Sequence, residues 1–597
     1  MQVSEVQGPA FLSPLRGQTI YNVQGLVSAK SSNSFWLLGP ISDVRFSPGL
    51  RVYTTSVSVL SSVKPGDHIS LTAEVTEYRS YAQLNNLFAT QLSSPKDIIV
   101  HSSDNVVSPI VIGVDRTPPT EELSIHDTGE DGWLSVPNNI SSIDHINATL
   151  RPDTYGLDFW ESLEGALVLI PSPIALNFPT RFHEFWVRGN WTATGVNSRG
   201  GLSLTINPDG VPDANPEAIL VGQPLDRSRN PDVSIGTKLS DIVGIVDYQH
   251  GFFNILPTTA PRVLSHPDDI PLTTNITSVA TDPCEVRFGD YNIENLGPRS
   301  THVHLVAEHI SSCLYSPDVI FLQEVQDNSG SRDDGTVAAN ITLDNLARAI
   351  TRANGGHYSF TNVDPLDNQD GGIPGGNIRP ALLFNPKKIG LVPGSPHGGP
   401  LDATKPFRDS DGKLRLTFNP ARIDPKNDAW FETRKPLVAH WRTPSGASFF
   451  TINHHGKSKR GSSSSHGDAR PPVNGGVEQR TAQVQIIADF VSSILALDPD
   501  ASIILAGDFN DYKQTRSLFT PLWGIMHDVD ALAGIPLEER YTYVYDQNCQ
   551  QLDHVFVSKA IADRGVEIEH VHVNVWARSI RERASDHDPT AGRIKVC

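Results

Sequence analysis

Acids, amides and histidines gather at six places in the second half of this sequence, each beside a short apolar run. The residues are Asn292, Glu294, Gln323, Glu324, His454, His455, Asp508, Asn510, Asp553, Asp586 and His587. A single acid after a strand is usually a solvated surface residue, and an isolated Asp-His-Asp is usually a turn. Six such places in one chain indicate a common site.

These residue types suit the hydrolysis of a phosphodiester with the help of a bound cation. Mg²⁺ prefers carboxylate, amide and water oxygens, and a cation of this kind neutralises a non-bridging oxygen of the phosphate. Glu324 and Asp586 are natural ligands. We therefore expect Mg²⁺ as the cofactor, with Mn²⁺ and Ca²⁺ as alternatives.

The same chemistry needs a base for the attacking water and a donor for the charge that develops on the phosphate. Asp508 beside Asn510 suits the base, and His587 suits the donor. A histidine in this role needs its second nitrogen fixed by a carboxylate, and Asp553 is the candidate because its strand must lie close to the last one. Asp588 is expected to fix the turn.

Two other hydrolytic chemistries are excluded by the motifs. The sequence has no G-x-S-x-G elbow, and Ser585, Asp586 and His587 are adjacent, so they cannot form a serial hydrogen-bonded triad. The stretch "HEFWV" is not the H-E-x-x-H motif of zinc peptidases.

From Cys284 onward, apolar strands alternate with amphipathic helices. Helices are predicted over 300–313, 342–353 and 478–496, where apolar residues recur at helical spacing. Strands that are buried on both sides, with helices outside them, indicate an α/β sandwich. Such a layout places the strand ends, and the polar residues on them, along one rim.

The first half reads as two small all-β modules. In "KPGDHISLTAEVTEY", apolar and polar residues alternate after a Pro-Gly-Asp turn, and "GTKLSDIVGIVDYQHGFFNIL" repeats this pattern weakly. Five-stranded barrels of the oligonucleotide/oligosaccharide-binding (OB) type fit both modules, and simple sandwiches fit nearly as well. The predicted order is an all-β module at 1–112, a linker at 113–152, a second module at 153–262, a linker at 263–283 and the α/β domain at 284–597.

The amino-acid composition limits the kinds of molecule that this protein is expected to bind. The 597 residues carry 48 Lys and Arg against 67 Asp and Glu, a net charge of -19, which argues against a general electrostatic grip on nucleic acid or an anionic membrane. A phosphate-bearing substrate must then meet local positive charge or a bound cation. No run of about 18 apolar residues occurs, so no membrane insertion is expected. The four cysteines allow two disulfides in three connectivities, or buried thiols.

The ordered set N-x-E, Q-E, N-x-H, G-D-F-N, L-D-H and S-D-H-D-P resembles the endonuclease/exonuclease/phosphatase superfamily, over roughly residues 284–597. That superfamily includes pancreatic-type deoxyribonucleases, abasic-site endonucleases, bacterial sphingomyelinases and inositol polyphosphate phosphatases. The longer motif "NHHGKSKRGSSSS", followed by Arg480 and Gln483, resembles the large extracellular nucleases with OB-like modules ahead of the catalytic domain. The resemblance implies a four-layer α/β sandwich of two packed mixed β-sheets flanked by helices.

Carried over by position, the resemblance implies roles for the residues above. The metal site would comprise Asn292, Glu324 and Asp586, with Glu294 close to it. Asp508 and Asn510 would handle the nucleophilic water, and His587 with Asp553 would contact the scissile phosphate. The N-x-H motif selects His455 over His454 in "NHH" as general acid or phosphate donor.

Three basic residues are expected to bind substrate. Arg379, in "NIRPALLFN", matches a position where relatives place an Arg or Tyr against the phosphate, although a surface Arg entering a strand is the alternative. Lys457 and Lys459 belong to the stretch 456–472, which has a local excess of three positive charges and would attract phosphate in a salt-dependent way. A flexible, Ser-rich solvated loop explains that stretch almost as well.

The first interpretation is a secreted, divalent-metal-dependent nuclease of low sequence specificity that acts on DNA and also on RNA. We expect a nucleic acid substrate, no obligate protein partner, and a signal peptide that is not part of this sequence. Five Asn-x-Ser/Thr sites, at Asn139, Asn147, Asn190, Asn275 and Asn340, are compatible with a secreted glycoprotein. The alternatives are a phosphatase or phosphodiesterase on phospholipids or inositol phosphates, and a non-catalytic polymer-binding protein.

Overall fold

A computed structural model describes residues 1–41, 43–80, 83–127, 134–136, 141–205, 211–268, 272–277 and 282–597. These residues form two compact units. Unit 1 consists of Met1–Asp268, Gly461–Asn474 and Tyr545–Cys549; unit 2 consists of Asp269–Arg460, Gly475–Val544 and Gln550–Cys597. The sequence motif at Asn139 lies outside the described residues.

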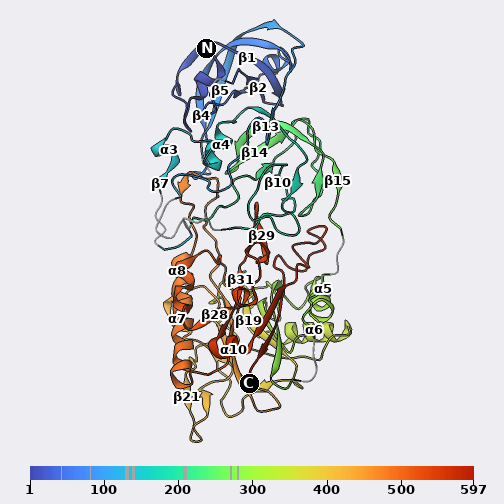
Figure 1. Cartoon of the computed structure of the whole chain (residues 1–597), viewed down its shortest axis with the longest axis vertical. Helices are drawn as coiled ribbons and strands as arrows, with labels where there is room; N and C mark the ends of the chain where they lie inside the picture. Colours follow the sequence, from blue (N-terminus) through green and yellow to red (C-terminus); the bar gives the residue numbers. More distant parts are fainter. Residues whose placement is uncertain are drawn as a thin grey trace. The chain divides into compact units, whose positions relative to one another are not determined.

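Unit 1 begins with a closed barrel of five strands in the order β1-β2-β3-β5-β4 (Figure 1). The elements of this region are α1 (Val3–Gln7), β1 (Thr19–Lys30), β2 (Ser34–Leu38), β3 (Gly49–Tyr53), α2 (Val57–Ser61), β4 (His68–Tyr78) and β5 (Ala89–Ser102). The alternating apolar residues of β4, among them Ile69 and Leu71, are buried in the barrel core. β3 and β5 are parallel, and the other neighbouring strands are antiparallel.

The second part of unit 1 is a nine-stranded sheet in the order β15-β12-β9-β10-β11-β14-β13-β8-β6. Its strands are β6 (Ile110–Val111), β8 (Leu167–Ile170), β9 (Ile174–Ala175), β10 (Phe185–Arg188), β11 (Ile219–Val221), β12 (Lys238–Leu239), β13 (Ile242–Gln249), β14 (Phe252–Pro257) and β15 (Val263–Ser265). This region is built mainly of strands, and a five-stranded barrel does not describe it. Several of its strands span only two or three residues, which is too short to give an alternating pattern in the sequence.

Unit 1 has three further elements, two of them in the predicted linker 113–152 and one at the start of the predicted second module. They are β7 (Ser141–Ser142), α3 (Ile143–Ile146) and α4 (Gly156–Glu161). β7 pairs with β26 (Ala469–Arg470), which belongs to one of the two late segments of unit 1. In Figure 1 this segment is the orange stretch beside β7.

Unit 2 contains two mixed sheets. The first has the order β18-β19-β17-β16-β33-β32, and the second has the order β20-β24-β25-β27-β31-β28, with β23 paired to β24. The first comprises β16 (Glu285–Leu296), β17 (Val319–Val325), β18 (Ser359–Asn362), β19 (Arg379–Phe384), β32 (Val566–His570) and β33 (Thr590–Lys595). The second comprises β20 (Gly390–Leu391), β23 (Ala421–Arg422), β24 (Leu437–Arg442), β25 (Ser448–His455), β27 (Ile503–Asp508), β28 (Met526–Asp528) and β31 (Asp553–Ser558).

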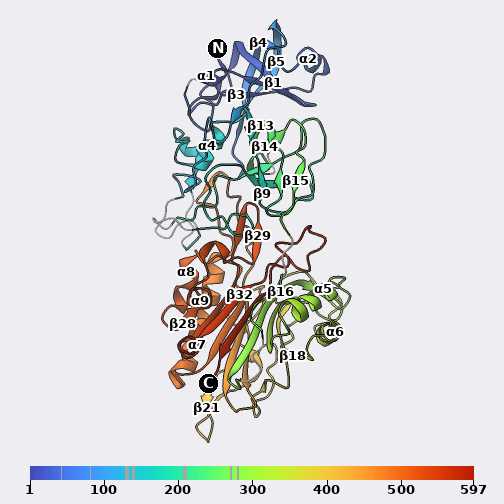
Figure 2. The same ribbon diagram turned by 45° about the vertical axis from the view of Figure 1, so that its right-hand side comes forward.

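Helices cover the outer face of each sheet, which gives the predicted four layers. Figures 1 and 2 show α7 on one side of the sheets and α5 and α6 on the other. Apolar residues of both sheets form one core between them, Phe288 and Ile504 among its members. A second core joins α7 to its sheet, and a third joins α5 and α6 to the other sheet.

The three predicted helices are present with small shifts in their ends. They are α5 (Val303–Glu308) continued by η1 (His309–Cys313), α6 (Asn340–Arg352) and α7 (Val477–Leu497). The shorter elements are β21 (Pro406–Arg408), β22 (Leu414–Leu416), η2 (Asp428–Trp430), α8 (Arg516–Phe519), η3 (Thr520–Leu522), α9 (Val529–Ala533), η4 (Leu537–Glu539), β29 (Tyr543–Tyr545), β30 (Asn548–Gln550) and α10 (Lys559–Arg564). Among the described residues, no helix combines the length and apolar character needed to cross a bilayer.

One disulfide closes unit 2. Cys284, just before β16, is bonded to Cys597, two residues after β33. These strands are neighbours in one sheet, so the bond joins chain segments that already lie together. Cys313 and Cys549 keep their thiols, so one of the two disulfides that the cysteine count allowed is formed.

Candidate active site

Strand register brings the predicted residues to one edge of unit 2. β25 runs parallel to β27 and places His455 beside Asp508, while β31 runs antiparallel to β27 and places Asp553 beside Asp508. In the other sheet β16 and β17 run parallel, and Asn292 and Glu324 lie near their carboxyl ends. Carboxyl ends of parallel strands share an edge, which explains why residues far apart in sequence meet there.

Asp508 lies at the centre of this group. Its Oδ1 accepts the backbone N–H of Asn510 at 2.7 Å, and its Oδ2 accepts the side-chain amides of Asn510 and Asn292, each at 3.1 Å. Burial raises the pKa of Asp508 to about 7, although the positive charge of His587 opposes the rise. A carboxylate whose pKa is near neutrality is matched to taking a proton from water.

His587 is held as a cation. Its Nδ1 lies 2.7 Å from Oδ2 of Asp553, and its Nε2 lies 3.9 Å from Oδ2 of Asp508. Burial by itself would lower the pKa of His587, but the charges of Asp553 and Asp508 outweigh it and hold the pKa well above its usual value. The second nitrogen of an imidazolium in this position can donate to an anionic group at the site.

The choice of His455 over His454 agrees with the geometry of β25. Successive strand residues face opposite sides. Nε2 of His455 lies 3.5 Å from Oδ2 of Asp508, whereas His454 points away and packs edge-on against Phe509. Burial, followed by the charge of Arg434, holds the pKa of His455 well below its usual value, so His455 is neutral.

Three carboxylates form the part of the site that suits a cation. Glu324 accepts the backbone N–H of Asn295 at 2.9 Å and the amide of Asn292 at 3.3 Å. Burial raises the pKa of Glu294, and the charges of Asp586 and Glu324 raise it further against the opposing charges of Arg583 and His587. Glu324 has a φ of 63°, an unfavourable value for a residue with a side chain, of the kind that clusters at functional sites.

This donor set fits a hard divalent cation, because carboxylate oxygens are its preferred ligands. The side chain of Asn292 is not oriented as expected for a metal ligand. Its nitrogen faces Glu324 and Asp508, and its oxygen accepts the N–H of Glu294 at 3.1 Å. In this orientation Asn292 positions the acids.

Among the described residues, one group of three potential ligand atoms lies within 4.8 Å of one another, and it consists of Asp508, Asp553 and His587. Metal binding through histidine requires a nitrogen without a proton. The two carboxylates instead stabilise the protonated form of His587. We therefore assign this trio to proton and charge handling.

Sequence reasoning missed two buried charged residues of the site. Asp290, two residues before Asn292 on the same face of β16, accepts the amide of Gln323 at 2.9 Å, and burial followed by the charge of Asp553 raises its pKa well above the usual value. Arg434 is 4% exposed and donates to the carbonyl of Gly456. Burial lowers its pKa, and the charges of Glu324 and Asp508 oppose that effect. The only sequence signal for Arg434 was a basic pair before β24, which is common on surfaces.

The segment before β30 was also missed. Thr542 donates from Oγ1 to Oδ2 of Asp553 at 2.5 Å, and its carbonyl accepts the N–H of Asp588 at 2.7 Å. The ring of Tyr543 lies 4.8 Å from the ring of His587. Asp588 in turn accepts the N–H of Asn574 at 2.7 Å, in agreement with its expected part in fixing the turn.

Arg379 does not lie where the predicted phosphate contact requires. It is 0% exposed, and its guanidinium donates to Asp364 at 2.8 Å and to the carbonyls of Val337 and Asn377. Both terminal nitrogens are thus used inside the protein. Arg379 begins β19 as a buried structural residue, which corrects the prediction from the sequence.

The two lysines differ in their surroundings. Lys457 is partly exposed, and its backbone N–H donates to Oε1 of Gln483 at 3.0 Å. Lys459 lies 3.4 Å from Oδ1 of Asp511 and over the ring of Tyr512 at 4.0 Å, and burial lowers its pKa to about 7. The local positive charge predicted here is therefore partly offset by Asp511.

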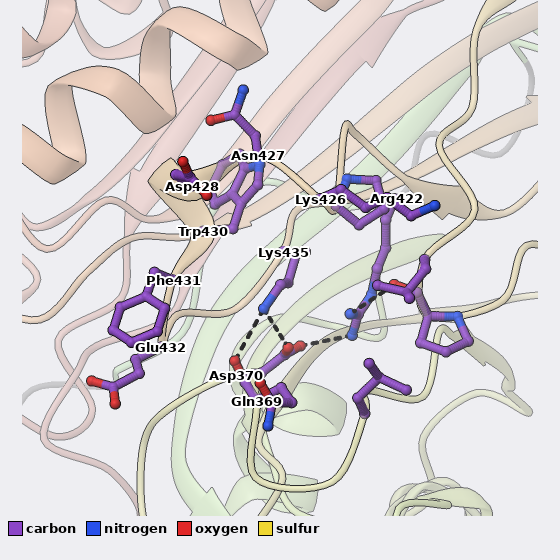
Figure 3. Close-up of a pocket in the computed structure, with 14 residues that line it drawn as sticks. Gln369, Asp370, Arg422, Lys426, Asn427, Asp428, Trp430, Phe431, Glu432 and Lys435 are labelled. Atoms are coloured by element: carbon purple, nitrogen blue, oxygen red, sulfur yellow. Dashed lines mark hydrogen bonds and ion pairs between the residues drawn. The ribbon is translucent and has the colours of Figure 1, made fainter.

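A cavity of about 210 Å³ lies beside the chain segment that follows Arg434 (Figure 3). On its floor, Asp370 accepts from Nζ of Lys435 at 2.7 Å and from Nη2 of Arg422 at 2.8 Å. Lys435 also donates to the carbonyls of Gln369 and Thr433. All three hydrogens of Lys435 are thus used within the protein, and we assign no ligand to this cavity.

The comparisons with known proteins match two separate regions of the chain, and the first region ends at residue 268, as does the first segment of unit 1. The model of the Endonuclease/Exonuclease/phosphatase family matches residues 291–587, and that of a domain of unknown function (DUF8508) matches residues 111–268. No curated protein matches the chain.

Several solved structures are similar to about half of the chain. An endonuclease/exonuclease/phosphatase from Bacteroides vulgatus is 15% identical, with 52% of this chain and 99% of that chain covered and a TM-score of 0.32. A humanized D. rerio TDP2 is 17% identical over 52% and 99%, with a TM-score of 0.34. The human Nocturnin catalytic domain is 15% identical over 53% and 95%, with a TM-score of 0.33.

The family match spans the ordered motifs from the end of β16 to His587, and the structure gathers those motifs at one edge of a four-layer sandwich. Members of this family are generally hydrolases that act on phosphoesters, typically with a divalent metal. Residues 291–587 of this chain belong to the endonuclease/exonuclease/phosphatase family.

Proposed function

We propose that this protein is a secreted, divalent-metal-dependent phosphodiesterase that hydrolyses DNA, and also RNA, with low sequence specificity. One observation carries the proposal. His587, kept charged by Asp553, lies 3.9 Å from the carboxylate of Asp508, and the acids Glu294, Glu324 and Asp586 act electrostatically on one another at the same site. Together they supply a base, a cationic donor and a place for a divalent cation.

The surroundings of each site residue support a particular step in phosphodiester hydrolysis. Asp508 takes the proton of the attacking water, and the backbone and amide of Asn510 hold the carboxylate in position. His587 donates to the phosphate as negative charge develops, and Asp553 fixes its orientation. His455, neutral and 3.5 Å from Asp508, is the second donor.

The resemblance and the donor set assign Glu324 and Asp586 to the cation, with Glu294 close by. When bound, a divalent cation supplies charge for a non-bridging oxygen of the phosphate. Glu324 is suited to this role because its side chain is 20% exposed and its carboxylate is fixed from two sides. Mg²⁺ is the proposed cation, with Mn²⁺ or Ca²⁺ as alternatives.

Two features of the chain support the proposals that the substrate is nucleic acid and that the protein is secreted. The first module is a closed barrel whose strand order, with β3 parallel to β5, supports an OB-like assignment, and that fold often binds oligonucleotides. The Cys284–Cys597 disulfide is typical of proteins that mature in an oxidising compartment. Lys457 remains a proposed phosphate contact.

The test is hydrolysis of plasmid DNA, RNA, sphingomyelin and inositol phosphates side by side, with Mg²⁺, Mn²⁺, Ca²⁺ or a chelator. We expect cleavage of the nucleic acids that a chelator abolishes. His587→Ala should lower kcat by about 10² to 10⁴, because it removes a donor that acts on the transition state.

His304→Ala is a matched control, since that histidine is exposed on helix α5 and has no assigned role in the chemistry. It should cleave like the wild type. Activity confined to sphingomyelin or inositol phosphates would replace the nuclease proposal with the alternative. Binding of DNA without cleavage under any metal would favour a non-catalytic protein.

A further inference from the structure

Two late segments of unit 1 directly follow, in sequence, residues that are assigned to the candidate site. We call Gly461–Asn474 the arch and Tyr545–Cys549 the hairpin tip. The arch follows Lys457 and Lys459 directly in sequence, and the hairpin tip follows Thr542 and Tyr543. Both segments interrupt unit 2 in sequence and pack with the residues of unit 1.

The arch is anchored in unit 1 by a buried ion pair. Nε of Arg470 donates to Oδ1 of Asp127 at 2.7 Å, a second nitrogen contacts Oδ2, and both residues are at most 1% exposed. Next to this pair, Asp468 accepts the hydroxyl of Ser142 at 2.7 Å and the N–H of Asp144 at 2.8 Å. A buried charge of this kind is costly without its partner, so the pair strongly favours the docked arch.

The middle of the arch lies in an aromatic core of unit 1. His466 is 0% exposed, and its ring lies 5.4 Å from that of Trp186 and 5.7 Å from that of Phe252. Its carbonyl accepts the hydroxyl of Tyr248 at 2.9 Å. The arch is thus packed as part of this unit.

The hairpin tip is held by a different set of contacts. Asn548 accepts the amide of Asn215 at 2.6 Å, and Gln547 donates to the carbonyl of Ala214 at 2.9 Å. The backbone N–H of Cys549 donates to the carbonyl of Leu202 at 2.7 Å. Because these contacts are independent of the arch, the two anchors can be tested separately.

The two segments follow residues that have different roles in the proposed reaction. The hairpin tip continues from Thr542, which fixes Asp553, and from Tyr543, which covers His587. The arch continues from the lysine stretch that is the proposed phosphate contact. An anchored segment restricts the conformations of the residues next to it in the chain. Those residues then lose less conformational entropy when substrate binds.

We propose that two anchors position the residues that precede them in the chain: Asp127 and Arg470 fix the arch, and with it the lysine stretch, for substrate binding, and Asn548 fixes the hairpin tip, and with it Thr542 and Tyr543, for the chemical step. The inference rests on the proposed phosphodiesterase activity. Residues of unit 1 act here through the chain that they hold and do not touch the substrate.

The experiment compares Asp127→Asn, Asn548→Ala and the control Arg51→Met in the full chain. Arg51 lies 3.9 Å from buried Asp247, a pair in unit 1 that holds neither segment. For a DNA oligonucleotide with Mg²⁺, Asp127→Asn should raise KM about 10-fold with kcat little changed. Asn548→Ala should lower kcat about 10-fold with KM little changed, and it should shift the pH profile through the altered Asp553–His587 pair.

Trypsin cleavage within Lys457–Arg460 gives a readout that needs no enzymatic activity. We expect Asp127→Asn to accelerate this cut about 10-fold, because cleavage follows local opening. Asn548→Ala and Arg51→Met should not accelerate it. The double variant Asp127→Leu/Arg470→Met, which replaces the ion pair by an apolar pair, should restore resistance if the loss came from the unpaired charge.

Equal kinetics and equal trypsin rates for Asp127→Asn, Asn548→Ala and Arg51→Met would overturn the inference. If the wild-type protein hydrolyses no phosphodiester at all, the proposed function fails. The trypsin rates then decide the inference by themselves: faster cutting in Asp127→Asn alone supports anchoring of the arch, and unchanged cutting rejects it.

Discussion

At the scale of single residues, the site separates three roles that the sequence placed together in "SDHD". The charge of Asp586 raises the pKa of Glu294, His587 is paired with Asp553, and Asp588 accepts a backbone N–H of the turn. Adjacent residues thus point to different partners, and substitutions at neighbouring positions should have distinct effects.

Glu324→Gln is predicted to weaken the dependence on Mg²⁺ far more than His455→Ala does. The amide keeps the shape of the side chain but loses the charge that attracts the cation, so the Mg²⁺ concentration for half-maximal activity should rise about 10-fold or more. His455→Ala should lower kcat with a smaller change in that concentration.

Titration of activity with Mg²⁺ measures both effects. Glu308→Gln, on exposed helix α5, is the matched control and should titrate like the wild type. Equal shifts for Glu324→Gln and His455→Ala would contradict the division between metal ligand and donor.

At the scale of elements, the close approach of β25 and β27 holds the site together. Gly507, directly before Asp508, has a φ of 138°, and a Cβ built on it would lie 2.0 Å from the carbonyl oxygen of His454. The glycine therefore permits the register that sets His455 beside Asp508.

Gly507→Ala is predicted to push β25 and β27 apart. Backbone on both sides leaves no flexible side chain to yield, so we expect a loss of kcat together with a lower free energy of unfolding, by about 1 to 3 kcal/mol. Thermal unfolding and kinetics of the same sample measure both. Gly446→Ala, in a turn with open space around it, tests whether a positive φ alone explains the loss.

Stability should also depend on pH through a buried acid of the second module. Burial, and then the charge of Asp213, raises the pKa of Glu217 from 4.5 to about 8, and one oxygen of Glu217 has no hydrogen-bond partner. The folded state thus binds a proton that the unfolded chain releases at lower pH. The stabilisation is present below pH 4.5 and is lost as the pH rises through about 8.

We therefore predict that the melting temperature of unit 1 falls from about pH 4.5 to about pH 8. Glu217→Gln should flatten this slope, because the amide is neutral at every pH. Calorimetry across this range checks it, with the exposed Glu74→Gln as the control. An unchanged slope in Glu217→Gln would contradict the assignment.

At the scale of the whole molecule, a single disulfide joins residues that are 313 positions apart. Such a bond stabilises chiefly by limiting the unfolded chain, and removing a native one costs about 2 to 5 kcal/mol. Cys284→Ser/Cys597→Ser is predicted to lower the melting temperature of unit 2 while leaving kcat nearly unchanged. Differential scanning calorimetry should show the transition of unit 2 at a lower temperature, and Cys313→Ser should leave that transition in place.

Much of the catalytic fold was accessible from the sequence because its strands and helices are long enough to show their periods. Helix α7 and strand β27 are examples: each has an apolar pattern that packs against a core. The nine-stranded sheet was not accessible, because strands such as β9 have only two residues. Arg379 was misassigned since a sequence does not reveal that a guanidinium is enclosed by its own protein.

The sequence by itself determined which residues could do the chemistry, because acids, amides and histidines at strand ends are recognisable by type, order and spacing. Only the tertiary structure decided how they are used. Strand pairing set Asp508 between His455 and Asp553, and burial beside fixed charges raised the pKa of Asp508 and of His587. Those effects depend on distance and solvent exclusion between segments far apart in the chain, which no local pattern encodes.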